Sequence, residues 1–318
     1  MPAESGLQVD GHPVIITGAD GMLGRGFREV LATIAPSAAV LAFSHTELDV
    51  TDREQVMSLA SAAPGTIVHC AGLTDADECE RDPASAHRVH HGGTENVVEL
   101  AQAVSARVLY PQSVFIFDGR ELPVTELTTP SPTLEYGRAK LAAERHLLAS
   151  LPQALVVRMA GFFGGDDKDK NFVGQFTRTL GNMLRTGETE IEVGDRVWQP
   201  TYTLDLAGNC CLLLARDCSG IYHMGAPGEA TFHEVATACV ESLGLERRIR
   251  VVPVSSSPFD RREDAKRPAR MVTRTARLDA EGLNRQRPWR AALHEYLQRP
   301  WFDAIRGASR GAETRAHE

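Results

Sequence analysis

The chain has 318 residues, 42% of them hydrophobic, and its 42 acidic and 34 basic side chains give a formal net charge of -8. This length and apolar content can build a full core in one large domain or two coupled ones, and the acidic balance argues against a nucleic-acid partner. No apolar run approaches the length of a membrane span and residues 1–10 lack a signal-peptide pattern, so we expect no membrane partner and a cytoplasmic protein.

The first predicted elements are a strand over residues 13–17, a glycine-rich turn, and a helix with apolar residues at helical spacing from Leu23 to Ile34. Glycines let the backbone turn sharply and approach phosphate groups, and a helix N-terminus presents free N–H groups to them. The order therefore predicts a dinucleotide site, although G-x-x-G-x-x-G differs from the G-x-G-x-x-G spacing of many dehydrogenases. The candidate cofactor contacts in the turn are Gly18, Asp20, Gly21, Met22, Leu23 and Gly24.

A second strand over residues 38–43 ends at Ser44 and His45. An acid at this point would bond an adenosine 2′-hydroxyl and repel a 2′-phosphate, and neither residue is acidic. We therefore expect both residues to contact the cofactor and NADP(H) to be slightly preferred over NAD(H). The alternative is that Ser44 and His45 are ordinary loop residues. Residues 48–52 then precede a helix for which Thr51 or Asp52 is a suitable N-cap.

A third strand over residues 66–70 leads into Ala71-Gly72-Leu73, a run that begins with small residues where a strand meets the cofactor. Residues 84–104 predict a long helix. Gly92-Gly93 lies inside it at a cost to helix stability, which predicts close packing against a neighbouring element.

The next strand and helix carry the candidate catalytic residues. The strand over residues 107–110 delivers Ser113 to the edge of the sheet where ligands of parallel strands bind. The helix over residues 131–150 carries Tyr136 and Lys140 on one face, so the ammonium can favour the ionised phenol and make the tyrosine a usable proton donor. Ser113 could hold the carbonyl being reduced. By itself, Tyr-x-x-x-Lys is more often surface decoration of a helix.

With a further strand over residues 154–158, the alternation of strands and helices predicts an α/β fold, a Rossmann-like doubly wound parallel sheet. From Gly164 a polar loop begins, and we expect a smaller C-terminal α/β substrate-binding region. We assign residues 1–163 to a dinucleotide-binding domain, to which the chain returns at about 200–224, and most of residues 164–318 to the substrate. The later predicted elements are helices over 172–185, 204–215, 232–243 and 289–297, strands over 190–193, 220–224 and 249–254, a Ser/Pro-rich loop over 255–258, and a frayed tail from about residue 307.

Cysteine and histidine spacing gives no metal signature. The six cysteines show no C-x-x-C pair and are interpreted as buried hydrophobes. The histidines include His87, His90 and His91 but no recognised ligand spacing, so the sequence predicts no metal site. A basic run from Arg261 to Arg270 is broken by acids and is interpreted as a solvated loop.

Taken together, the order of motifs resembles the extended short-chain dehydrogenases/reductases, and within them the dTDP-4-dehydrorhamnose reductase group. The resemblance covers the chain from Val14 to Leu297. It rests on Thr17-Gly18-x-x-Gly21-x-x-Gly24, Leu48-Asp49-Val50-Thr51-Asp52, Phe117-Asp118-Gly119, Tyr136-Gly137-x-x-Lys140, Asn171-Phe172-Val173, Gln199-Pro200-Thr201-Tyr202 and Gly220-Ile221-Tyr222-His223.

The resemblance implies a role for each matching position. Gly21, Met22 and Leu23 would lie under the pyrophosphate, Asp49 and Val50 would contact adenine, and Ala71, Gly72 and Leu73 would lie beside the nicotinamide ribose. Ser113 would bond the substrate carbonyl and Tyr136 would donate the proton. Lys140 would bind the nicotinamide ribose and lower the pKa of Tyr136.

Three positions depart from the pattern of that group. Val114 replaces an aspartate, Gly161 replaces a tryptophan and His90 replaces an asparagine. The first two positions normally face the sugar, so a different or bulkier ketone than the rhamnose precursor is an open alternative. The candidate substrate contacts are Ser113, Val114, Gly161 and Asn171.

The resemblance implies a reductase that transfers hydride from NADPH or NADH to a nucleotide-linked 4-keto-6-deoxy sugar or a related ketone, with a homodimer possible. A 4,6-dehydratase is disfavoured because Val114-Phe115 offers no acid after Ser113. An epimerase remains an alternative, since the same triad serves that chemistry. A second alternative is a non-catalytic dinucleotide-binding subunit similar to the regulatory β subunit of methionine adenosyltransferase.

Overall fold

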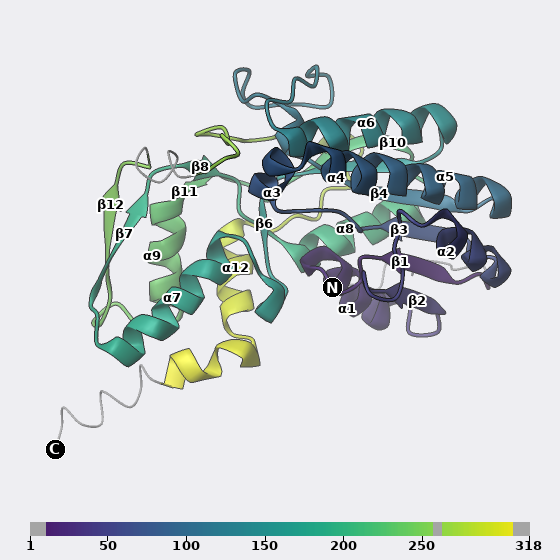
Figure 1. The fold of residues 1–318 in the computed structure, drawn as a ribbon. Helices are drawn as coiled ribbons and strands as arrows, with labels where there is room; N and C mark the ends of the chain where they lie inside the picture. The colour runs from purple at the N-terminus through teal and green to yellow at the C-terminus, as the bar shows by residue number, and fades with distance from the viewer. Residues whose placement is uncertain (1–10, 257–262, 308–318) are drawn as a thin grey trace.

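The computed structural model describes residues 11–256 and 263–307, which form two adjacent groups of elements (Figure 1). The larger group is a six-stranded sheet with helices on both faces. Residues 257–258 of the expected Ser/Pro-rich loop and residues 308–318 of the expected tail lie outside the described residues. None of the described helices is long and apolar enough to cross a membrane.

The central sheet has the strand order β10-β5-β4-β3-β1-β2. Its strands are β1 (Val14–Thr17), β2 (Val40–Phe43), β3 (Thr66–His69), β4 (Arg107–Ser113), β5 (Leu155–Met159) and β10 (Gly220–Met224). All neighbouring strands run parallel, which confirms the expected α/β fold with a parallel central sheet. The turn after β1 and Ser113 at the end of β4 therefore reach the same edge of the sheet, where ligands of such folds bind.

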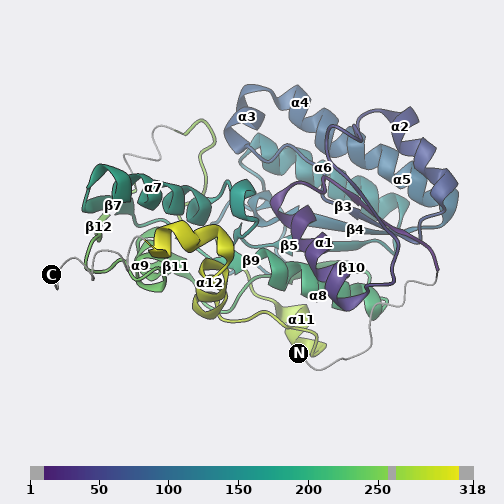
Figure 2. The ribbon, with the colours of Figure 1, turned by 90° about the horizontal axis from the view of Figure 1, so that it is seen from below.

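The two faces of the sheet are buried by different helices (Figure 2). Because strand side chains alternate between faces, Ile16 packs with α1 (Met22–Ile34) and α8 (Thr203–Ala215), whereas Ile15 packs on the opposite side. That opposite layer consists of α2 (Arg53–Ser58), α5 (Gly93–Val104) and α6 (Glu135–Ser150). Asp52 caps α2, accepting from the N–H groups of Glu54 and Gln55.

Two predicted helices differ from the observed ones. The helix expected over residues 131–150 begins only at Glu135, after an extended Leu134. The helix expected over residues 84–104 consists of α4 (Pro83–His87), a π-helical turn (Arg88–Gly92) and α5. Gly93 packs as expected, because a Cβ there would lie 2.8 Å from Cγ2 of Val50, whereas Gly92 faces open space.

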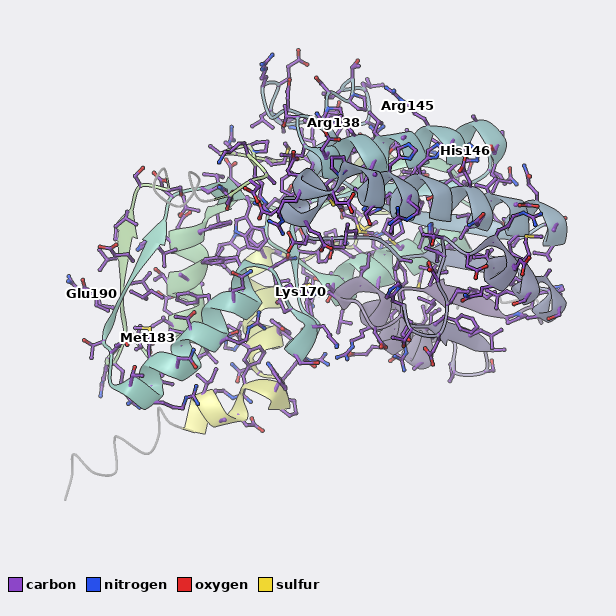
Figure 3. All side chains as sticks on the ribbon, viewed as in Figure 1. Arg138, Arg145, His146, Lys170, Met183 and Glu190 are labelled. Carbon is purple, nitrogen blue, oxygen red and sulfur yellow. The ribbon has the colours of Figure 1, made fainter. Side chains whose placement is uncertain are left out.

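The smaller group has its own core. Its elements are α7 (Phe172–Thr186), β7 (Glu190–Gly194), α9 (Phe232–Ser242), β12 (Arg250–Val254) and α12 (Trp289–Leu297), with β7 and β12 paired in parallel. One buried cluster joins the three helices through residues such as Phe176, Val235 and Leu293. Figure 3 places Met183 and Glu190 of this group on the side away from the six-stranded sheet.

Several short elements were not predicted, because two to six residues carry too little periodicity. They are α3 (Ala76–Arg81), β6 (Phe162–Phe163), β8 (Val197–Trp198), β9 (Thr201–Tyr202), β11 (Ala230–Thr231), α11 (Ala276–Ala280) and 3-10 turns at Leu59–Ala62, Val114–Ile116, Asp166–Lys168 and Pro300–Phe302. β6 pairs with β9, and β8 pairs with β11. These pairs connect the end of β5 to the smaller group.

The basic run is not simply a solvated loop, as we had interpreted it. Arg261 and Arg262 lie outside the described residues, but Arg267 binds Asp77 of α3 at 3.2 Å and Arg270 binds Glu229 at 2.8 Å. Val197 of β8 also bridges to Arg270 through the backbone. The segment therefore links the helical layer of the sheet to β8, and its acids and bases are ion-pair partners.

Candidate active site

Ser113 and Tyr136 meet at the C-terminal edge of the sheet. Ser113 ends β4, in register with Met159 at the end of β5, and its hydroxyl accepts a hydrogen bond from the Phe115 N–H at 3.1 Å. Tyr136 lies in the first turn of α6, and its phenol lies near the Ser113 hydroxyl. The structure thus brings together a hydroxyl and a phenol that are 23 positions apart in the sequence.

Tyr136 is partly buried between the helical layer and the segment after β3. Its ring meets the His90 ring edge-on, with centroids 5.4 Å apart, and packs near Leu73 and Ala139. Burial raises the pKa of Tyr136 to about 12, although the nearby Ser113 hydroxyl acts in the opposite direction. We had expected Lys140 to lower this pKa; the net direction is upward, because burial outweighs the effect of Ser113.

Lys140 is buried, and its ammonium contacts β4. The Nζ atom donates to the Pro111 carbonyl oxygen at 2.6 Å and lies 3.9 Å from the centroid of the Tyr110 ring. Burial lowers the pKa of Lys140 to about 7, against the opposing effects of Cys70 and Glu144. The lysine therefore changes charge near neutral pH.

This pKa predicts how stability depends on pH. Between pH 7 and 10.5 the unfolded chain holds a proton on Lys140 that the folded protein has lost, so the contribution of this residue to stability rises with pH across that window. We expect Lys140→Met to remove a rise on the order of a few kcal/mol. Urea unfolding at pH 7 and pH 9 measures it; an equal pH slope in the variant and the parent would contradict the expectation.

A buried polar network lies behind Lys140. Arg158 of β5 and Glu144 of α6 form an ion pair at 2.5 Å, with side chains only 4% and 3% exposed. Gln112 donates both to the Lys140 carbonyl oxygen at 3.0 Å and to Glu144 at 2.9 Å. The network holds the turn of α6 that carries Lys140 against β4 and β5. We did not predict it, although a charged residue in the apolar strand around Arg158 was a usable signal.

The turn after β1 has the shape that a dinucleotide requires. A Cβ at Gly18, where φ is +63°, would lie 2.7 Å from the Ala71 backbone nitrogen, and a Cβ at Gly24 would lie 2.4 Å from the Gly18 carbonyl oxygen. Gly21 precedes α1 and no side chain caps the helix, so its first N–H groups are free of side-chain acceptors. Close backbone approach and an open helix N-terminus fit a pyrophosphate.

The other predicted cofactor residues lie along the same edge. Ala71 donates its N–H to the Thr17 hydroxyl, and the Leu73 carbonyl oxygen is 2.9 Å from His90 Nε2. Gly72 lies against the His90 ring, so His90 contacts both this segment and Tyr136. Asp49 accepts from the Thr51 N–H and hydroxyl, and Val50 packs on Gly93.

An acid that sequence reasoning missed lies at the end of β2. Glu47 accepts hydrogen bonds from the Ser44 backbone N–H at 2.8 Å and from the Ser44 hydroxyl at 2.6 Å. We had considered only Ser44 and His45 at this point. A carboxylate three residues further along the chain folds back onto Ser44, and His45 is exposed.

The comparison with protein families decides the assignment. A model described as "RmlD substrate binding domain" matches residues 12–301. The chain belongs to this family. The expected resemblance to the dTDP-4-dehydrorhamnose reductase group is confirmed, and with it, at the level of the family, the expectation of an NAD(P)-dependent oxidoreductase.

Similar proteins support the assignment over most of the chain. A dTDP-4-dehydrorhamnose reductase of Mycolicibacterium smegmatis is 34% identical, over 91% of this chain and 86% of the relative. The crystal structure of dTDP-4-dehydrorhamnose reductase from Bacillus anthracis, in complex with NADP, gives a TM-score of 0.80 at 27% identity and covers 90% of this chain and 98% of that one. Methionine adenosyltransferase 2 subunit beta of Rattus norvegicus is 27% identical over 92% and 90% of the two chains.

The predicted substrate contacts of this RmlD-family chain differ in how deeply they are buried. Val114 is only 4% exposed and packs with Ile116 and Leu141, so its side chain belongs to a core cluster rather than to an open site. Val114 stays a predicted substrate contact, and the 3-10 turn after Ser113 places its side chain largely inside the protein. Asn171 donates its side-chain amide to the Phe162 carbonyl oxygen at 2.7 Å.

Gly161 lies in the open, just beyond the end of β5. A Cβ on this glycine would lie 2.8 Å from Cε3 of Trp198, so the indole ring of β8 covers the space in front of it. The related reductase group has a tryptophan at the position of Gly161. A tryptophan at position 161 of this chain would collide with Trp198.

The polar loop after Gly164 packs against other elements of the protein. A Cβ at Gly165 would lie 3.1 Å from the Met22 Cα, and Asp167 binds Arg25 at 2.6 Å. Asp166 binds Arg299 at 3.1 Å. The loop therefore packs against the start of α1, beside a hollow of about 210 Å³.

Another hollow lies away from the candidate triad. It measures about 650 Å³ and is lined by residues such as Gln199, Glu229, Arg270 and Asn284, with no member of the candidate triad. Position and lining separate it from Ser113 and Tyr136, so we base no catalytic role on it.

Proposed function

We propose that the protein is an NADPH-dependent reductase of a nucleotide-linked 4-keto-6-deoxy sugar. The observation that carries the proposal is that Tyr136 lies near Ser113 at the sheet edge, in a chain whose relatives are named dTDP-4-dehydrorhamnose reductases. The glycine-rich turn lies at the same edge and has the open helix N-terminus that a dinucleotide needs. In this reading residues 1–163 hold the cofactor and most of residues 164–318 hold the substrate.

Each member of the triad has a physical task. When bound, NADPH supplies hydride to the keto carbon. Ser113 donates to the carbonyl oxygen and orients it, and Tyr136 transfers its phenolic proton to that oxygen as charge develops there. Because the pKa of Tyr136 is about 12, the phenol keeps its proton at neutral pH and can act as the acid. Lys140, on the same face of α6, would bind the nicotinamide ribose.

The test is the oxidation of NADPH, followed at 340 nm, with a panel of nucleotide-linked 4-keto-6-deoxy sugars. The proposal predicts turnover with at least one of them and loss of turnover in a Tyr136→Phe variant. Product analysis separates a reductase from an epimerase, because only a reductase consumes one NADPH for each sugar converted.

A binding subunit is the second candidate, favoured by the similarity to methionine adenosyltransferase 2 subunit beta. The proximity of Tyr136 to Ser113 and the buried Lys140 speak against it, since a subunit that only binds dinucleotide has no use for a proton donor of this kind. Tight NADPH binding without turnover of any sugar in the panel would favour the subunit.

Cofactor choice gives a prediction at Glu47. We expect a lower Kd for NADPH than for NADH, since NADP is the dinucleotide named with a similar reductase. The Glu47 carboxylate at Ser44 repels a 2′-phosphate, so Glu47→Gln should lower the Kd for NADPH by roughly five- to tenfold and should not lower that for NADH, whose 2′-hydroxyl a carboxylate can bond.

Calorimetric titration of both cofactors measures these constants, with Glu54→Gln, another exposed acid, as the matched control. Tighter NADH binding by the parent protein would remove the NADP preference. An unchanged ratio in Glu47→Gln would remove the role of the carboxylate.

A further inference from the structure

The indole ring of Trp198 covers exposed backbone at Gly161, at the sheet edge that carries Ser113. Ser113 is in register with Met159, and Gly161 follows two residues later at the same sheet edge. The indole ring lies in front of the exposed Gly161, whose carbonyl oxygen is held by the Thr201 N–H at 3.0 Å. The strand pairing therefore fixes an aromatic face against a bare stretch of main chain, within two residues of the end of β5.

The surroundings of Trp198 make its ring a rigid wall. Phe232 meets it edge-on with centroids 5.6 Å apart, and Phe172 does so at 6.4 Å. Phe172 and Phe232 stack on each other at 4.4 Å. These contacts hold the indole in one orientation, while the residue as a whole stays partly exposed.

The indole Nε1 atom is buried and has no hydrogen-bond partner in the described residues. Buried tryptophan N–H groups usually find a partner, so this donor is available to a ligand. A sugar has an apolar ring face that can pack on the indole, and hydroxyl oxygens that can accept a hydrogen bond from Nε1.

We propose that Trp198 contacts the sugar of the substrate and forms the wall of its subsite above Gly161. The proposal rests on the proposed function for its ligand. The indole, which comes from β8, occupies the space that a side chain at Gly161 would fill. Trp198 is thus a specificity-determining residue. Its ring also limits the size of the side chain that position 161 can carry.

The test measures binding without turnover. In the presence of NADP, titration with dTDP-rhamnose and with dTDP alone, by calorimetry and tryptophan fluorescence, isolates the contribution of the sugar. We expect Trp198→Ala to raise the Kd for dTDP-rhamnose at least tenfold, to leave that for dTDP within twofold, and to leave NADP binding unchanged. Trp289→Phe, in α12, is the control for fluorescence.

Gly161→Ala guards against a variant that merely misfolds. The added Cβ would press on Trp198 and should weaken dTDP-rhamnose binding, and the double variant Gly161→Ala/Trp198→Ala should bind no worse than Trp198→Ala. Equal affinity of the parent and Trp198→Ala for dTDP-rhamnose would overturn the proposal. Failure of every keto sugar to oxidise NADPH would instead count against the proposed function, because these titrations require no turnover.

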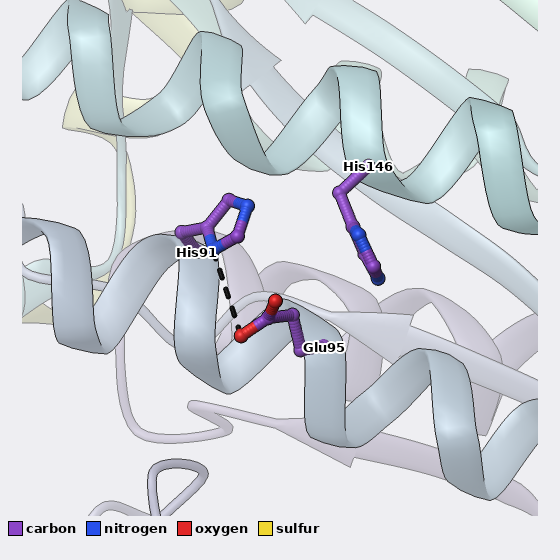
Figure 4. A group of neighbouring side chains, drawn as sticks. All are labelled: His91, Glu95 and His146. Carbon is purple, nitrogen blue, oxygen red and sulfur yellow. Dashed lines mark ion pairs between the residues drawn. The ribbon is translucent and has the colours of Figure 1, made fainter.

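A separate group of side chains has the composition of a transition-metal site. His91 and Glu95 lie four residues apart where the π-helical turn joins α5, and His146 projects toward them from α6 (Figure 4). Their potential ligand atoms all lie within 4.8 Å of one another, with His91 Nδ1 and Glu95 Oε2 3.6 Å apart. The site draws on two helices, which explains why sequence spacing predicted none.

We infer that His91, Glu95 and His146 bind one divalent transition-metal ion such as Zn²⁺, with water completing the coordination. Two imidazoles and a carboxylate suit such an ion, and bonds of about 2.0–2.2 Å require only that the partly exposed side chains move together. The ion would fasten α5 to α6. It would act on structure, since Tyr136 is contacted by the neighbouring His90 and not by His91.

Titration of untagged, EDTA-treated protein with ZnCl₂ tests the site. We expect one strong site, a higher Tm with Zn²⁺, and at least tenfold weaker binding in His146→Ala and in Glu95→Gln. His294→Ala removes an exposed histidine of α12 and should bind as the parent does. No binding by the parent, or equal binding by His146→Ala and the parent, would overturn the inference.

Discussion

Replacing Tyr136 by phenylalanine should lower kcat for sugar-dependent NADPH oxidation by roughly 10² to 10⁴-fold, the range expected for loss of a positioned acid. The substitution removes one oxygen and keeps the ring that packs against His90 and Leu73. We therefore expect the Kd for NADPH to change by no more than about twofold and the melting temperature to stay close to that of the parent. The loss falls on proton transfer, because the hydroxyl beside Ser113 at the sheet edge is gone.

Tyr222→Phe is the matched control for this variant. Its hydroxyl donates to Glu281 at 2.7 Å from β10, the edge strand of the sheet, so the same atom is removed away from Ser113. Its kcat should stay within about twofold. If Tyr136→Phe kept more than a tenth of the parent kcat while Tyr222→Phe kept all of it, Tyr136 could not be the acid, and the subunit alternative would gain ground.

The fold could be predicted from local sequence pattern, because each strand of the sheet is a recognisable short apolar run. β1 is a β-branched apolar run followed at once by glycines, and β4 ends in Ser113 before a proline-rich loop, so both element and edge were predictable. The same reasoning placed Ser113 and the turn after β1 at the ligand-binding edge of the sheet, and Tyr136 on one face of a helix with Lys140.

What the sequence did not predict depends on contacts between distant segments. Val114 turns inward because a 3-10 turn follows Ser113, and no periodicity marks a turn of three residues. Glu47 reaches Ser44 only after the chain folds back, and Trp198 reaches Gly161 only through the pairing around β9. The predicted direction of the Tyr136 pKa shift was also wrong, since the burial of this side chain depends on the whole fold.

Removing the Glu144 carboxylate should give the largest loss of stability. Glu144→Gln leaves Arg158 charged, 3% exposed as a residue, and without its ionic partner. Breaking a buried pair from one side costs about 3–5 kcal/mol of unfolding free energy, because the remaining charge stays out of water. Urea denaturation at pH 7 measures it. Since Gln112 bridges Glu144 to the Lys140 carbonyl oxygen, kcat should also fall at temperatures where the variant is still folded.

Two comparisons show whether burial is the cause. Glu99→Gln breaks the ion pair of Glu99 with Arg53, whose side chains are 42% and 61% exposed, and should cost less than about 1 kcal/mol. Glu144→Met/Arg158→Met removes both charges and should recover much of the stability lost in Glu144→Gln, because no unpaired charge remains. A Glu144→Gln variant no less stable than Glu99→Gln would mean that water reaches Arg158, and that the network does not fix the turn of α6 that carries Lys140.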